Sequence, residues 1–163
     1  MANIQIKTTY NEWVPLTFKL VGQPAYLKLA LIHAGNETSD VALNYKLNNG
    51  DWTTYNINNQ IELHSGDTIA FSGSTEHFST GLNNNYYFIK DAVGSNPFYL
   101  EVYGNIQSLV NYREFLVDDY QYAQLFSPLG LVNDASKLIL PNNTTSHCYE
   151  QMFKNCNYLT AVP

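Results

Sequence analysis

Few residues of this chain could do chemistry, and their spacing matches no catalytic or metal-binding pattern. The sequence has no His-x-x-x-His or Cys-x-x-Cys pair, no Gly-x-Ser-x-Gly turn to present a nucleophile, and no phosphate-binding glycine loop. It therefore predicts a protein that is not an enzyme and that uses no cofactor. The scattered histidines are His33, His64, His77 and His147.

Two groups of side-chain oxygens have simpler explanations than a reaction or an ion. Asp118 and Asp119 could be an acid/base pair, but adjacent helical residues point about 100° apart, and carboxylates at a helix start are favoured by its dipole. Asp51, with Asn48 and Asn49, could bind a hard cation through oxygens. However, Asn-Asn-Gly-Asp is also a typical hairpin turn sequence. We therefore expect no metal site.

The two cysteines are more consistent with packing than with redox or metal chemistry. Cys148 and Cys156 are eight residues apart, which on a continuous helix is about 12 Å of rise. A disulfide requires Cα atoms about 4–7 Å apart. A metal pair is the alternative, but only His147 is close enough in the sequence to help. We expect two buried, reduced thiols without metal.

Aromatic side chains beside turns are the remaining candidates for a binding site. Flat rings can stack on a sugar or on an apolar patch of a partner, while asparagines hydrogen-bond hydroxyl groups. The competing interpretation is that most of these rings are ordinary core or strand-face residues. The candidates are Tyr10, Trp13, Trp52, Tyr86 and Tyr87.

The elements that would position these residues are mostly strands. From Trp13 to Tyr103 apolar residues alternate with polar or small ones, as half-buried antiparallel strands require. Turn sequences separate the strands about every 8–12 residues. We expect residues 1–104 to form an antiparallel β-sandwich, and the pattern does not choose between jelly-roll and immunoglobulin-like topologies.

Two later segments share one pattern, so residues 105–163 are expected to form a helical connector and about two repeat units. Tyr122-Ala-Gln-Leu-Phe126 aligns with Tyr149-Glu-Gln-Met-Phe153 at an offset of 27 residues (149 − 122). Apolar spacings of three and four predict a short helix, with extended segments before and after it. The expected repeat core is Tyr122, Leu125, Phe126, Tyr149, Met152, Phe153, Cys156 and Leu159.

The second segment resembles the BspA-like leucine-rich repeats of gut bacterial (Bacteroidetes) surface proteins. The resemblance covers the last quarter of the chain, and the first segment departs from it, as an atypical capping repeat would. More loosely, the upstream part looks like the β-rich leader of such arrays in these bacteria and their phages. The matching residues are Leu140-Pro141, Thr144-Thr145, Cys148-Tyr149, Met152-Phe153, Cys156, Leu159-Thr160 and Pro163.

Composition and the chain start limit the functions that fit. With 8 Lys+Arg against 14 Asp+Glu, the net charge of −6 argues against nucleic-acid binding. No apolar window of about 18 residues exists, so we expect no membrane insertion. The N-terminus lacks a secretory signal. Either the chain acts without export, or a signal has been removed.

The resemblance implies a non-enzymatic structural or attachment protein. The favoured expectation is a phage virion component (a head fibre, decoration or tail-associated protein) whose sandwich forms a homo-oligomer or binds other virion proteins, while its repeats contact a surface. The alternative is a bacterial cell-surface adhesin or glycan-binding module that binds a host surface glycan. Two units fall short of the ~3 that a solenoid needs. We therefore expect a partner, the sandwich, or further repeats beyond Pro163 to cover the array.

Overall fold

The computed structural model is mainly β, which confirms the expected class. It describes residues 13–22, 26–35, 41–74, 78–93, 98–112, 118–142 and 144–163. In these residues it contains strands and two short 3-10 helices, but no α-helix. The elements are β1 (Leu16–Gly22), β2 (Tyr26–Ala34), β3 (Leu43–Leu47), β4 (Thr53–Tyr55), β5 (Ile61–His64), β6 (Thr68–Gly73), β7 (Asn85–Val93), β8 (Phe98–Asn105), η1 (Ile106–Leu109), η2 (Ser127–Leu129) and β9 (Val132–Ile139).

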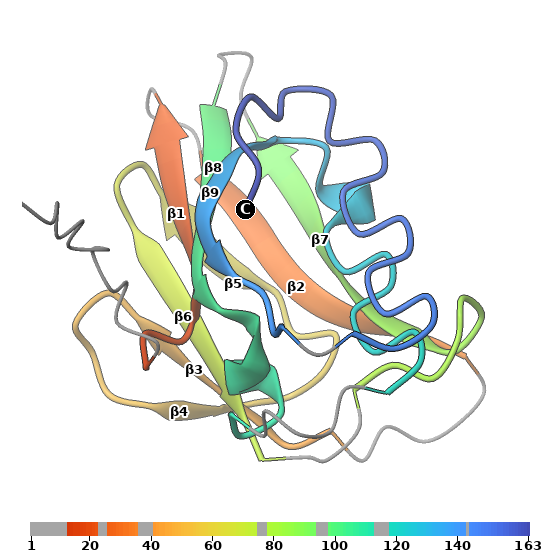
Figure 1. Ribbon diagram of the computed structural model, residues 1–163. Helices are drawn as coiled ribbons and strands as arrows, with labels where there is room; N and C mark the ends of the chain where they lie inside the picture. The colour runs from red at the N-terminus through yellow and green to blue at the C-terminus, as the bar shows by residue number, and fades with distance from the viewer. Residues whose placement is uncertain are drawn as a thin grey trace, which may run out of the picture.

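The strands form two sheets, visible in Figure 1. The larger sheet has the order β4-β3-β6-β1-β8-β9, and the smaller has the order β5-β2-β7. All strand pairs are antiparallel except β8 and β9, which run parallel. β9 lies in the sequence between the two segments that share the 27-residue pattern, so this part of the chain also contributes a strand to the larger sheet.

Aromatic rings from both sheets meet in one core. Phe18 on β1 lies 4.6 Å from Phe88 on β7, measured between ring centroids, and Phe71 on β6 lies 5.1 Å from Phe88. Phe126 joins them, with its ring 5.8 Å from that of Phe18. All four rings are fully buried. The ranges expected as separate domains, residues 1–104 and 105–163, therefore share this core.

A buried tyrosine also links the two sheets by hydrogen bonds. The hydroxyl of Tyr55, on β4 of the larger sheet, accepts a 2.8 Å bond from the backbone N–H of Leu31, on β2 of the smaller sheet. It donates a 2.6 Å bond to the backbone oxygen of Asn59. Because burial disfavours the charged phenolate, the pKa of Tyr55 is raised above its usual value.

After η1 the expected helices are wrong, because the described chain winds in tight turns. We call residues 118–130 the inner coil and residues 145–157 the outer coil. Backbone φ is positive at every fourth residue of each coil, which an α-helix does not allow. Turns of four residues also bring side chains three and four apart to one side, so the apolar spacing mimicked a helix. The positive-φ residues are Tyr120, Gln124, His147, Gln151 and Asn155.

The inner coil departs from this regular winding at one proline. Pro128 stands 27 positions before Asn155, whose φ is +66°. Because the proline ring fixes φ near −65°, a third residue with positive φ cannot follow Tyr120 and Gln124 there, and the chain enters η2 instead. Gly130, with φ of +63°, then ends η2 and leads the chain toward β9.

The later part of the chain contacts both sheets. Figure 1 shows the two coils wound one beside the other next to β7. The backbone N–H of Phe88 on β7 donates to the oxygen of Leu125 in the inner coil, at 2.9 Å. On the opposite layer Ala161 forms a parallel bridge with Asp134 on β9. The extended segments expected around the 27-residue pattern thus lie at β9 and at Ala161.

Candidate functional site

The two coils are joined by a regular row of backbone hydrogen bonds. Within the inner coil, Tyr120, Tyr122, Gln124 and Phe126 donate their amide protons to outer-coil oxygens. The acceptors, in the same order, are Ser146, Cys148, Glu150 and Met152, at 3.3, 3.0, 2.9 and 3.0 Å.

The amides between these donors bond inside their own coil. Ala123 donates to the oxygen of Tyr120 at 2.9 Å, and Leu125 donates to that of Tyr122 at 3.3 Å. Successive amides of the inner coil therefore alternate between closing a turn and joining the next coil. This alternation satisfies every amide from Tyr120 to Ser127.

Side chains 27 residues apart stack on one another across the coils. The rings of Tyr122 and Tyr149 are 5.9 Å apart and inclined by 10°. Tyr120 and His147 are 4.8 Å apart at 6°. The third pair, Phe126 and Phe153, is 5.4 Å apart at 29°. Stacked pairs of this kind contribute roughly 0.5–1.5 kcal/mol each beyond burial.

Gln124 and Gln151 form a fourth pair of side chains 27 residues apart, which is joined by hydrogen bonds instead of ring stacking. The Nδ2 of Asn85, on β7, donates to Oε1 of Gln124 at 3.1 Å. Gln124 in turn donates from Nε2 to Oε1 of Gln151 at 3.0 Å. This relay of amides runs outward from the sheet to Gln151, whose Oε1 also accepts a 3.2 Å bond from Nζ of Lys154.

Burial falls sharply from the inner to the outer member of each pair. Tyr122 and Phe126 are completely buried, whereas Tyr149 and Phe153 are only partly buried. Burial raises the pKa values of Tyr122 and Tyr149 well above the usual range of a tyrosine. Of the expected repeat core, Leu125, Met152 and Cys156 are also buried, and Leu159 is partly buried.

The outer coil ends in a row of unused backbone donors. Its amides at Cys148, Glu150, Met152, Lys154 and Cys156 close turns, as in the inner coil. The amides of His147, Tyr149, Gln151, Phe153 and Asn155 have no hydrogen-bond acceptor among the described residues. The first four of them stand 27 positions after the four donors that join the coils.

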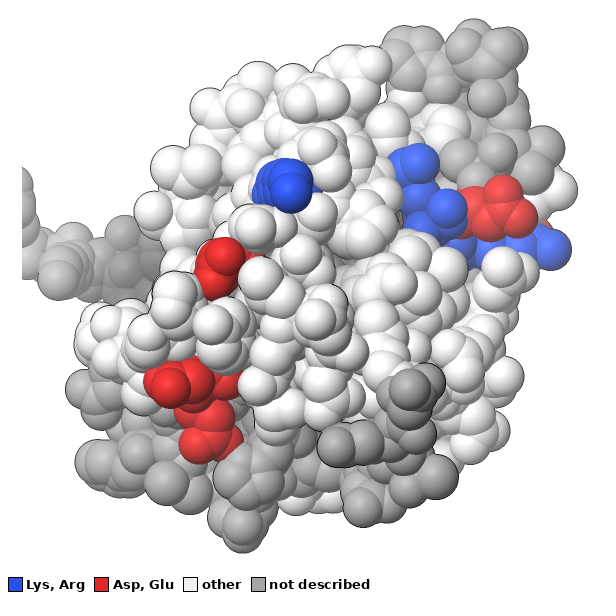
Figure 2. Space-filling view, turned by 90° about the vertical axis from the view of Figure 1, so that its right-hand side faces the viewer, with Lys and Arg blue, Asp and Glu red and all other residues white. Residues whose placement is uncertain are grey.

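We call this row, together with the outer faces of its side chains, the open edge. It lies on the side of the molecule that faces the viewer in Figure 2. That side is largely free of charged side chains, which are confined to a few small groups. The open edge thus combines partly exposed rings, one amide side chain and backbone donors. Two charged side chains lie against it: Glu150 is 2.8 Å from Nδ1 of His147, and Lys154 donates to Oε1 of Gln151 at 3.2 Å.

The thiols lie in the coils, away from any described metal-binding group. Cys148 and Cys156 are free and buried. The Sγ of Cys156 donates to the oxygen of Phe126 at 3.4 Å, across the coils. Burial raises the pKa of both thiols. Among the described residues no group of three His, Cys, Asp or Glu side chains could hold a metal ion.

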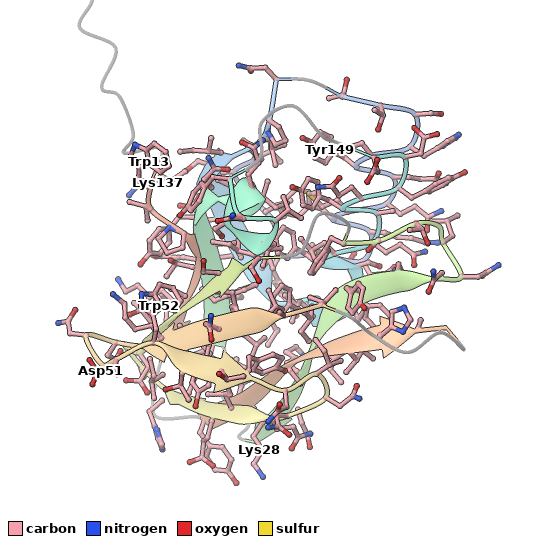
Figure 3. The ribbon with its side chains drawn as sticks, turned by 90° about the horizontal axis from the view of Figure 1, so that it is seen from below. Trp13, Lys28, Asp51, Trp52, Lys137 and Tyr149 are labelled. Atoms are coloured by element: carbon pink, nitrogen blue, oxygen red, sulfur yellow. The ribbon has the colours of Figure 1, made fainter. Side chains whose placement is uncertain are left out.

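The aromatic candidates do not form one surface. Trp13 and Trp52 are 73% and 45% exposed, while Tyr86 is buried against His33 and Phe78 and offers no free ring face. Tyr87 is partly buried, and Tyr10 lies outside the described residues. In Figure 3 both tryptophans lie on the side of the molecule opposite Tyr149.

Each exposed tryptophan has its own neighbour. The ring of Trp13 lies 5.3 Å from that of Tyr112, and the backbone oxygen of Trp13 accepts a 2.9 Å bond from the Tyr112 hydroxyl. The Nζ of Lys46 lies 5.4 Å from the ring centroid of Trp52. A cation held over the ring occupies the face that a sugar would use.

The other candidates take part in local structure. Asn48 occupies the turn after β3 with φ of +52°, and its amide bonds both the Asp67 carboxylate and the Thr68 N–H, each at 2.9 Å. The backbone N–H of His64 and the Asn48 amide together lower the pKa of Asp67. Asp118 begins the inner coil rather than a helix, and Asp119 is exposed. His77 lies outside the described residues.

A shallow pocket of about 210 Å³ lies between β1, β8 and β9. Its charged side chains are largely paired: Nζ of Lys19 lies 3.9 Å from Oε2 of Glu101, and Asp134 accepts bonds from the hydroxyl and backbone N–H of Ser136. The Ser136 bonds lower the pKa of Asp134. The lining residues are Lys19, Glu101, Val102, Tyr103, Asp134 and Lys137.

No family model, curated protein or solved structure matches this chain. None of the helices in the described residues is long and apolar enough to cross a membrane.

The sequence analysis aligned Tyr122 with Tyr149 and Phe126 with Phe153. It missed one amide side chain of the open edge and the two amide side chains that support it. Gln124, Gln151 and Asn85 were overlooked because a polar side chain carries no signal of burial by itself. The signal was nevertheless present, since the same 27-residue offset places glutamine over glutamine. Tyr120 and His147 occupy corresponding positions as well, with different but equally flat side chains.

Proposed function

We propose that this chain is a non-enzymatic structural or attachment protein that uses the open edge to contact another macromolecule. One observation carries the proposal: the row of hydrogen bonds and stacked side chains that builds the coils ends with its donors unused and its rings half exposed. Unpaired donors beside exposed apolar rings are typical of a surface that a partner covers. The low charge of this side supports the same conclusion.

In this proposal the two sheets form a sandwich-type domain, and the coils are two units related to BspA-like repeats. The motif residues of the resemblance support this relation, since Tyr149, Met152 and Phe153 lie at the stacking positions. The inner coil in turn bonds to β7 through the N–H of Phe88, so the two-sheet body supports the open edge. A compact body that presents one edge suits a fixed component of an assembly.

The biological setting that we propose is a phage virion, as a head fibre, decoration or tail-associated component. The proposal rests on the resemblance to gut bacterial and phage proteins and on the acidic, charge-poor composition. Homo-oligomer formation would use the two-sheet body. Electron microscopy of particles carrying the gene, with mass spectrometry of their proteins, tests it. Absence of the protein from purified particles would contradict the virion setting.

A glycan-binding adhesin on a bacterial surface is the second candidate. The observation that favours it is the exposed Trp13 ring, held beside Tyr112 by a hydrogen bond and an aromatic contact. A glycan array with the purified protein tests this function, with Trp13→Ala as the site variant. Trp52→Ala is the matched control, since Lys46 already covers that ring. Glycan binding that is lost only with Trp13→Ala would favour the adhesin.

A further inference from the structure

We propose that the open edge binds one kind of partner: a segment of a separate polypeptide that is wound like the outer coil and presents backbone oxygens at alternate residues. This inference rests on the proposed function and specifies the partner. It follows from the polarity of the edge, from the register of the coils, and from the groups that a second copy of this chain could offer.

The polarity of the edge selects the chemistry of the partner. The unused groups at Tyr149, Gln151 and Phe153 are all backbone N–H donors, and Nε2 of Gln151 is a donor as well. These unused donors require acceptors opposite them. Carbonyl oxygens at every second residue of a polypeptide have the spacing that the outer coil itself offers to the inner coil, through Cys148, Glu150 and Met152.

The register of the side chains selects the shape of the partner. Each paired side chain of the outer coil lies against the inner-coil side chain 27 residues before it. A segment that stacks on the outer coil as the outer coil stacks on the inner would place flat side chains over Tyr149 and Phe153. It would also place an amide or carboxyl oxygen where Nε2 of Gln151 can donate.

A second copy of this chain does not fit the edge through the same surface. Two copies joined edge to edge would oppose donors to donors, leaving all of them unpaired and buried. The outer-coil oxygens from Thr145 to Phe153 already accept bonds from the inner coil or from their own turns. In the inner coil, Leu125 and Ala123 direct their oxygens to β7, where Phe88 and Asn85 use them. The outer coil therefore has no free row of oxygens between Thr145 and Phe153 for another copy.

The probe that the structure supplies is the outer coil itself. A synthetic peptide of residues 141–163 carries the turn sequence, the rings and the glutamine that the edge requires. A control peptide has Tyr149→Asp and Phe153→Asp, which removes the stacking rings and leaves the host protein unchanged. In a second arm, a copy of residues 137–163, one period of 27 residues, is appended to the full chain after Pro163. Its control carries the same two changes in the copy alone.

The measurement is amide hydrogen exchange at Tyr149, Gln151 and Phe153 of the host chain. We expect saturating peptide, and the appended copy, to slow exchange at these three amides at least about tenfold. The control peptide and control copy should not slow it. Equal exchange with peptide and control in both arms overturns the proposal. Protection by the appended copy but not by the peptide overturns the separate polypeptide as partner.

These outcomes are distinct from the tests of the proposed function. Particle composition and glycan binding do not depend on amide exchange at the open edge. A chain found in particles whose edge gains no protection would retain the attachment function and lose this partner. A chain absent from particles whose edge is protected by the peptide would keep the partner and lose the virion setting.

Discussion

The side chain of Gln124 donates a 3.0 Å hydrogen bond to the side chain of Gln151, 27 residues further along the chain. Gln124 also accepts from Asn85 on β7, so it stands in the middle of a relay of three amides. Both glutamines have positive φ, 59° and 56°. Because the two backbone conformations are alike, the same substitution at either glutamine has a similar backbone cost, and the difference in unfolding free energy reports on the side chains.

Gln124→Leu should destabilise the protein more than Gln151→Leu. The first change removes two hydrogen bonds and leaves Nδ2 of the buried Asn85 with only its long 3.5 Å bond to the oxygen of Ala123. A poorly satisfied buried polar group costs about 1–3 kcal/mol. The second removes only the terminal member. Urea unfolding of both variants checks this prediction. Equal losses of unfolding free energy would show that the relay does not contribute to stability.

Phe126→Ala should cost about 3–5 kcal/mol of unfolding free energy, as expected for a fully buried ring. Phe153→Ala should cost less, about 1–2 kcal/mol, because its ring is only partly buried and stacks mainly on Phe126. The sequence analysis placed both phenylalanines in the repeat core, and the structure shows that only Phe126 is fully buried. Denaturation of the two variants side by side measures it, and a larger loss at Phe153 would contradict the burial pattern.

Tyr55→Phe should lower the unfolding free energy by about 1–3 kcal/mol, because the buried N–H of Leu31 loses its acceptor while the ring packing is kept. Tyr45→Phe is the matched control, since Tyr45 packs edge-on against Tyr55 and is only partly buried. Thermal or chemical unfolding compares the two. A neutral Tyr55→Phe would mean that this hydroxyl does not tie the sheets together.

Both thiols should react slowly in the folded protein. Cys148 and Cys156 are 2% and 8% exposed, and burial raises their pKa values, so little thiolate forms near neutral pH. A raised folded-state pKa favours the protonated form. The resulting stabilisation is fully present below the unfolded pKa of about 8.5 and is lost as pH rises through the folded-state pKa.

Alkylation followed by mass spectrometry tests this prediction, with the protein unfolded in urea as the control for intrinsic reactivity. Rates in the native protein should fall well below those in urea at pH 7 and approach them only at alkaline pH. Native and unfolded rates that agree at pH 7 would show that the coils expose their thiols. Bound zinc, measured by elemental analysis, would contradict the metal-free interpretation.

The strands could be predicted because burial on one face leaves a direct trace in the sequence. In β1, the alternating residues Leu16, Phe18 and Leu20 are all buried. The coils could not be predicted as coils, because apolar side chains three and four apart occur in an α-helix and in four-residue turns alike. Only the positive φ at residues such as Gln124 and Gln151 distinguishes them, and neither residue is a typical choice for that conformation.

The open edge was beyond sequence reasoning for a different reason. The repeated rings indicated which residues face the neighbouring unit, since Tyr122 and Tyr149 were aligned correctly by their offset. The sequence did not show which backbone amides close turns and which join the coils, because this depends on backbone geometry rather than on side-chain type. Trp13 and Tyr86 were equivalent candidates in the sequence, yet one is exposed and the other is core.

The most direct test of the coil stack is native-state hydrogen exchange by NMR on the unmodified chain in dilute solution. We expect the amides of Tyr122, Gln124 and Phe126 to exchange slowly. Their counterparts 27 residues later, Tyr149, Gln151 and Phe153, should exchange near the rate of unprotected amides, while Glu150 and Met152 between them stay protected. Uniform protection, or uniform fast exchange, along residues 147–154 would contradict the alternation and with it the open edge.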